Sequence, residues 1–77
     1  MERNAGGEGV KNKLILELDA AEYKAWDSLS RYKFQMFGYW AAIWVHLNRI
    51  GGFGRSNPWG GLVKMARDEM SGVNSNG

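Results

Sequence analysis

The chain has 77 residues, a formal net charge of +2 and no cysteine. Its length allows one small domain, and the lack of cysteine excludes disulfides and thiolate metal sites. The 10 basic residues are spread along the chain, so the positive charge permits nucleic acid binding without predicting it. Residues 1–10 and 72–77 are rich in Gly, Asn and Ser, and we expect two disordered tails around a single domain of residues 11–71.

The first element that the sequence predicts is a β-strand. In KNKLILELD, three leucines (Leu14, Leu16 and Leu18) recur at every second position, and this period is typical of a half-buried strand. No second strand is evident. The strand over residues 13–18 would therefore need another edge to pair with, from its twin in a homodimer or from another protein. An extended segment that lies across the helices is the alternative.

A helix is predicted next. Asp19, with Glu22 three residues later, resembles a capping box and predicts a helix start near Ala20. Gly38 either ends this helix or lies within one long bent helix. From residue 39 to residue 50 the helical pattern is clear.

A glycine-rich loop then leads to a last predicted helix. The loop reads GGFGRSNPWGG, and its Asn57 and Pro58 predict a cap followed by the first helical residue. This helix is expected to run to about Met70, with Gly72 as its stop. The predicted fold class is therefore α+β and mainly helical, with one N-terminal strand followed by two or three helices.

The stretch MFGYWAAIWVHLNRI, residues 36–50, is rich in aromatic side chains. On a helix its apolar residues span roughly 220°, more than the stripe of about 100° that covers one core. It is shorter than the roughly 20 apolar residues that a membrane span needs. We therefore expect burial in the core or in an interface, and no membrane association. The expected partner-binding residues are Trp40, Trp44, Trp59, Phe53 and Arg55, since Trp, Tyr and Arg are enriched at binding hot spots.

The sequence contains no recognisable catalytic or cofactor motif. His46 is the single histidine, and no cysteine or carboxylate stands near it at the spacing of a metal site. No nucleophile triad, phosphate loop or metalloprotease motif can be assembled. We therefore expect no enzyme activity, no cofactor and no metal. Phe53, Arg55 and Trp59 could stack on bases or contact a phosphate, which keeps DNA as an alternative partner.

The segments KLILELD, AAEYKAWDSLSRYKF and the helix ending at HLNRI resemble the ribbon-helix-helix group of DNA-binding dimers. In that family two strands pair across a dimer and their outward residues enter the major groove. The resemblance implies a DNA-binding transcriptional repressor in which Lys13, Ile15 and Glu17 face the bases. The DNA-contacting residues of this alternative are Lys11, Lys13 and Arg55.

The chain is also similar in size and character to small inhibitor proteins that phages and mobile elements encode, anti-CRISPR proteins among them. This likeness rests on the small size, the lack of catalytic residues and a surface suited to interaction. Our main expectation is a non-enzymatic protein-binding module, and the likeness implies an inhibitor of host machinery. Since MERNAGGEG has no apolar signal segment, we expect a cytoplasmic protein.

Overall fold

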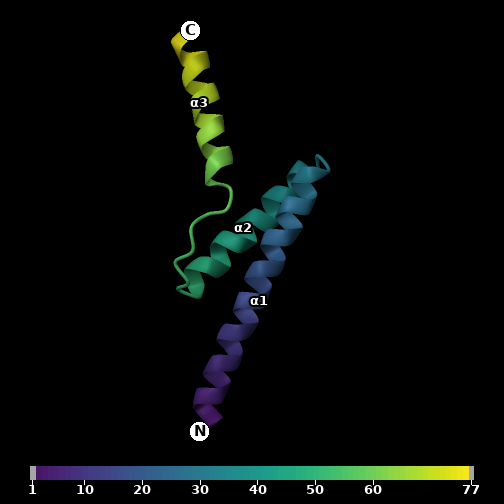
Figure 1. Ribbon diagram of the computed structural model, residues 1–77, viewed down its shortest axis with the longest axis vertical. Helices are drawn as coiled ribbons and strands as arrows, with labels where there is room; N and C mark the ends of the chain where they lie inside the picture. Colours follow the sequence, from purple (N-terminus) through teal and green to yellow (C-terminus); the bar gives the residue numbers. More distant parts are fainter. Residues whose placement is uncertain (1, 77) are drawn as a thin grey trace.

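In a computed structural model the chain is a helical hairpin followed by a third, projecting helix (Figure 1). The structure describes the backbone of residues 2–76 and the side chains of residues 9–72. The helices are α1 (Glu2–Ser30), α2 (Phe34–Ile50) and α3 (Gly60–Asn76). No strand occurs among residues 2–76, so the predicted α+β fold is wrong. The backbone of residues 2–10 and 72–76 is helical, where the sequence predicts tails.

The segment predicted as a strand, residues 13–18, lies in the middle of α1. Leu18 is fully buried and Leu14 packs against the core, whereas Leu16 is 69% exposed. Leucines four residues apart share a helix face, and the leucine between them points elsewhere. Because the backbone of this segment is bonded within α1, it offers no edge for a twin strand. The segment therefore provides neither the strand for the predicted homodimer through residues 13–18 nor the predicted ribbon that reads DNA.

Two predicted helix starts also differ from the structure. Asp19 does not cap a helix, since α1 already runs through it. The turn after α1 is closed by Ser28, whose carbonyl accepts hydrogen bonds from the backbone N–H groups of Arg31 (3.1 Å) and Lys33 (2.9 Å). Tyr32 adopts a positive φ of 62° in this turn. The last helix begins at Gly60, two residues after Pro58.

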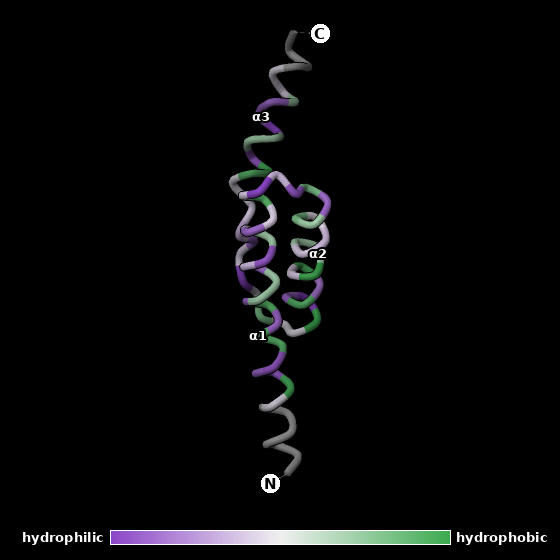
Figure 2. The backbone as a smooth tube through the Cα atoms, turned by 90° about the vertical axis from the view of Figure 1, so that its right-hand side faces the viewer, coloured by the Kyte–Doolittle hydropathy of each residue, from purple (hydrophilic) through white to green (hydrophobic). Residues whose placement is uncertain are grey.

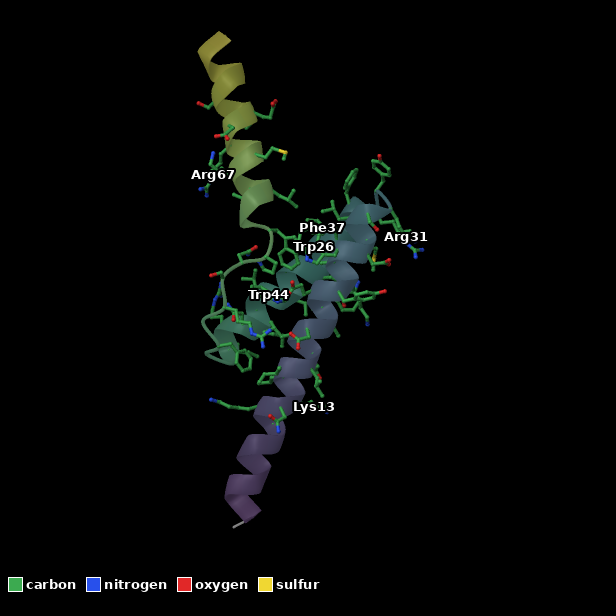
Figure 3. All side chains as sticks on the ribbon, viewed as in Figure 1. Lys13, Trp26, Arg31, Phe37, Trp44 and Arg67 are labelled. Atoms are coloured by element: carbon green, nitrogen blue, oxygen red, sulfur yellow. The ribbon has the colours of Figure 1, made fainter. Side chains whose placement is uncertain are left out.

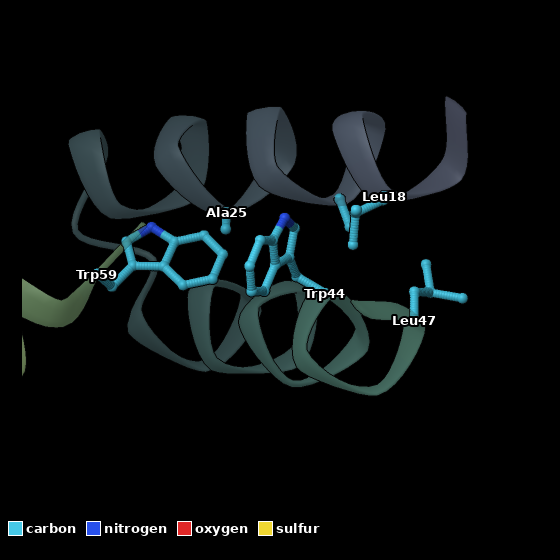
Figure 4. Packing of buried hydrophobic residues seen from close by; sticks show 6 residues of the cluster. Leu18, Ala25, Trp44, Leu47 and Trp59 are labelled. Atoms are coloured by element: carbon cyan, nitrogen blue, oxygen red, sulfur yellow. The ribbon is translucent and has the colours of Figure 1, made fainter. Parts of the chain in front are cut away.

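The contact between α1 and α2 joins small side chains to large ones. Ala21, Ala25 and Ser28 of α1 are buried. Trp44 of α2, 2% exposed, belongs to one core cluster with Ala21 and Ala25. Figure 4 shows Trp44 between the two helices, with Ala25 on the facing side of α1. Small residues on one helix let the backbone approach, so that the indole fills the space between the axes. This pairing of sizes determines how closely the hairpin packs.

The loop of residues 51–59 folds back onto the hairpin and inserts Trp59 into its core. Trp59 is 4% exposed, and its ring centroid lies 5.6 Å from those of Phe37 and Trp44 and 6.0 Å from that of Trp26. The contacts with Phe37 and Trp44 are edge-to-face, the geometry that aromatic quadrupoles favour. Trp59 therefore joins α1, α2 and the loop into one core (Figure 4).

Asn48 and Arg55 fix the course of this loop. The Asn48 side chain donates to the Arg55 carbonyl (3.0 Å) and accepts from the Arg55 N–H (3.1 Å). The Arg55 guanidinium also donates to the Asp19 carboxylate on α1 at 2.8 Å. Gly52 and Gly54 have φ values of +63° and +64°, which side chains disfavour. The loop is thus attached to both helices before it delivers Trp59.

The shape of the molecule is elongated. Its extents are 63 × 24 × 14 Å, and its radius of gyration is 16.6 Å, against about 11–12 Å for a compact domain of this length. In the described part of the chain α1 and α2 pack along each other, whereas α3 reaches the core through Leu62 at its start. Figure 2 shows these two side by side while α3 continues beyond them. Much of the chain's apolar surface is therefore left uncovered.

Replacing Trp59 with alanine should strongly destabilise the hairpin. Truncating a buried tryptophan costs about 3–5 kcal/mol, a large share of the total stability of a small domain. We expect a much lower midpoint of thermal unfolding by circular dichroism. Tyr23→Ala, at a site that is 71% exposed, should change the unfolding free energy by at most about 0.5 kcal/mol. Similar midpoints for the two variants would contradict the placement of Trp59.

Enlarging a small residue of the hairpin contact should also destabilise it. Ala25 is fully buried, whereas Ala20, on the same helix, is exposed. Ala25→Leu should cost about 1–3 kcal/mol, because the added atoms push α2 away. Ala20→Leu should be nearly neutral, since both residues favour helices. Chemical denaturation of the pair measures this difference, and equal stabilities would show that α1 and α2 do not pack as described.

Candidate protein-docking surface on α2

One face of α2 carries large apolar side chains that the rest of the chain does not cover. At 100° per residue these side chains fall within one arc, on the edge of α2 opposite the one that Asn48 ties to the loop. We call this set the outer stripe. It consists of Met36, Tyr39, Trp40, Ile43 and Ile50.

The outer stripe is exposed to a degree that is unusual for its residue types. Met36 is 45% exposed, Tyr39 55% and Ile50 57%, while Trp40 and Ile43 are partly buried against the core. The partly buried residues hold the stripe on a rigid helix, and the exposed ones give it contact area. Contiguous exposed apolar side chains of this kind mark interaction sites.

Trp40 is the centre of the stripe. Its ring meets that of Tyr39 edge-to-face, with centroids 5.0 Å apart. The Nζ atom of Lys24 from α1 lies over the Trp40 ring, 4.4 Å from its centroid. This cation–π contact holds a positive charge directly beside the apolar surface.

Further basic residues extend this positive edge along α1. Lys13 and Arg31 lie three turns before and two turns after Lys24, so the three side chains share one face of α1. Arg31 forms an i,i+4 ion pair with Asp27 at 3.3 Å. Glu17 and Asp27 are the acidic residues on this face, against three basic ones. The outer stripe is therefore bordered on its α1 side by an edge of net positive charge.

Of the five predicted partner-binding residues, one lies on this surface. Trp40 belongs to the outer stripe, but Trp44 and Trp59 are buried inside the chain itself. Phe53 packs against Gly51 and the core, and Arg55 is bonded to α1 and α2. Trp59, predicted as a partner contact in the loop, is only 4% exposed because the loop folds back onto the hairpin.

The residues that the DNA-binding alternative requires do not form one surface. Lys11 and Lys13 are exposed, but two residues on a helix lie about 200° apart. Ile15 is partly buried, and Glu17 lies on the positive edge instead of in a ribbon. Arg55 is bonded to Asp19.

Sequence reasoning missed Tyr39 and Lys24 as members of a site. Tyr39 falls at the border of the polar residues on a helical wheel, and its contact with Trp40 depends on side-chain conformation. Lys24 is contributed by a different helix, so no local pattern connects it to Trp40. The spacing of residues 36, 39, 40 and 43 is the one signal that pointed to a continuous stripe.

No protein-family model, curated protein or solved structure matches the chain. Within the described residues, no three His, Cys, Asp or Glu side chains come together as a metal site. His46 is exposed on α2. None of the described helices combines the length and apolar character that crossing a bilayer requires.

Proposed function

We propose that the chain is a non-enzymatic protein-binding module whose outer stripe docks an acidic amphipathic helix of another protein. The observation that carries this proposal is the arrangement around Trp40. A rigid helix presents exposed Met36, Tyr39 and Ile50, and Lys24 lies on one side of them. A helix with an apolar face and acidic residues along one border would complement both features.

The two parts of the surface would contribute differently to binding. Burial of Tyr39 and the exposed part of Trp40 supplies most of the affinity, since aromatic side chains dominate interface energies. The positive edge, Lys13, Lys24 and Arg31, sets the orientation and speeds the encounter with an acidic partner. Binding should therefore weaken as salt is raised, while a salt-resistant apolar part remains.

A protein partner is favoured over an anionic membrane by the distribution of charge. Helices that lie on membranes carry Lys and Arg along their polar face. The polar face of α2 carries Gln35, Ala42 and His46, with Arg49 as its single basic residue, whereas Lys13, Lys24 and Arg31 line the α1 side. This one-sided arrangement suits a second helix lying beside the first. The likeness to small phage-encoded inhibitors predicts that the partner belongs to host machinery, and this stays a prediction.

The test uses a fluorescein-labelled synthetic helix with apolar residues at i, i+3 and i+7 and glutamates along one border. Its binding is followed by fluorescence anisotropy with the wild-type chain and two matched variants. Tyr39→Ala removes a residue of the outer stripe. Tyr23→Ala removes a tyrosine that is also exposed, 71% against 55% for Tyr39, from the solvent face of α1. We expect Tyr39→Ala to weaken binding roughly tenfold, as loss of about 1–2 kcal/mol implies, and Tyr23→Ala to leave it unchanged.

A scrambled peptide of the same composition and anionic phospholipid vesicles serve as controls. Equal binding of the scrambled peptide would show that charge alone is recognised. Binding to the vesicles without binding to the peptide would replace the protein partner with a membrane. Equal losses for the two tyrosine variants would remove the outer stripe from the site.

A further inference from the structure

The exposed helix α3 has an apolar face that nothing in the described chain covers. Val63 is 45% exposed and Met70 60%, and with Ala66 they border an open groove along the helix. Leu62 is the last residue of α3 to pack against the hairpin core. Figure 3 shows Arg67 on α3 well away from the hairpin. The chain therefore carries a second apolar surface, separate from the outer stripe.

This helix has little reason to be stable alone. It begins with two glycines and contains Gly72, and glycine is among the least favourable residues inside a helix. Packing of an apolar face usually supplies the missing stability. Its own hairpin does not supply that packing, because Trp59 fixes the start of α3 on the loop side of the hairpin, opposite the outer stripe.

The spacing of the face is that of a coiled-coil seam. Val63, Ala66 and Met70 recur at intervals of three and four residues, the a and d positions of a heptad. Lys64 and Asp68 then fall on the outer side, where they pair with each other at 3.0 Å. The small Ala66 side chain in the middle of the seam would let two helices approach closely.

The two residues that flank the seam carry opposite charges. Arg67 lies on one border and Glu69 on the other, at the e and g positions. When two identical helices pair in parallel about a two-fold axis, opposite borders face each other, whereas in an antiparallel pair like borders meet. A parallel pair of α3 helices therefore brings positive borders to negative ones. The seam is complementary to a second copy of itself.

The exposed area of the chain is also sufficient for an interface. The chain exposes 6063 Å², while a compact monomer of 8.7 kDa exposes about 4,700 Å². The excess of about 1,300 Å² belongs to the whole chain, the outer stripe included, and it is larger than the roughly 800 Å² that each partner contributes to a standard interface.

We propose that the chain forms a parallel homodimer through α3, with Val63, Ala66 and Met70 at its seam. The hairpins then lie at the same end of the paired helices, and each presents its outer stripe outward. The pairing itself does not depend on the function proposed for the outer stripe. If both hold, the dimer is bivalent, and a partner with two acidic helices binds more tightly than either site alone.

The test compares two methionines of nearly equal exposure on one helix, Met70 (60%) and Met65 (62%). Met70 lies in the seam, and Met65 lies about 130° away from its centre. Met70→Lys should abolish the dimer through repulsion of like charges, although a lysine near the helix C-terminus favours the helix itself. Met65→Lys should leave the dimer intact. Light scattering across a dilution series measures both, with the wild type expected at twice 8.7 kDa.

Single cysteines test the direction of pairing, since the chain has none of its own. Val63→Cys should form a disulfide-linked dimer under mild oxidation, because only a parallel pair places residue 63 opposite its twin. Asp68→Cys, on the outer side, should not. A wild type that is monomeric at every concentration, or equal dissociation of the two lysine variants, would overturn the proposal. Loss of α2-dependent peptide binding without a change in mass would instead affect only the proposed function.

Discussion

The fold depends on the insertion of Trp59 between α1 and α2. This indole contacts Trp26 on α1 and both Phe37 and Trp44 on α2, so it joins elements that are far apart in sequence. Without it, the hairpin would consist of a single line of contacts between two helices. The indole N–H groups of Trp44 and Trp59 are buried without hydrogen-bond partners, so apolar packing must outweigh a cost of about 1–3 kcal/mol for each. The core is therefore small, aromatic and sensitive to shape.

The same insertion leaves the rest of the molecule open. Because the loop and Trp59 occupy one side of the hairpin, the outer stripe on the other side of α2 receives no cover from the chain itself. Because Trp59 ends the loop at the hairpin, α3 begins at a fixed point and projects outward (Figure 1). The placement of Trp59 thus leaves both the outer stripe and the apolar face of α3 uncovered. We interpret one of them as a docking site for a partner and the other as a contact between copies.

Local patterns identified the helix over residues 39–50 and its excess of apolar surface, but they failed for residues 13–18. Leu14, Leu16 and Leu18 fit a strand, whereas Leu14, Leu18, Ala21 and Ala25 fit a helix that packs at intervals of four and three residues. The choice between them depends on α2, whose Trp44 makes Ala21 and Ala25 into core residues. The burial of Trp59 could not be predicted from local patterns either, since it depends on the hydrogen bonds between Asn48 and Arg55. Lys24 and Trp40 meet only after the hairpin has formed.

We propose the outer stripe as the surface that recognises a partner helix. This proposal is tested most directly by nuclear magnetic resonance, with the ¹⁵N-labelled chain titrated with the acidic amphipathic peptide. We predict that amide shifts concentrate on Met36, Tyr39, Trp40 and Ile43 of α2 and on Lys24 of α1, while Tyr23 and the outer side of α3 stay unchanged. Shifts spread over the loop of residues 51–59, or confined to α3, would contradict the claim.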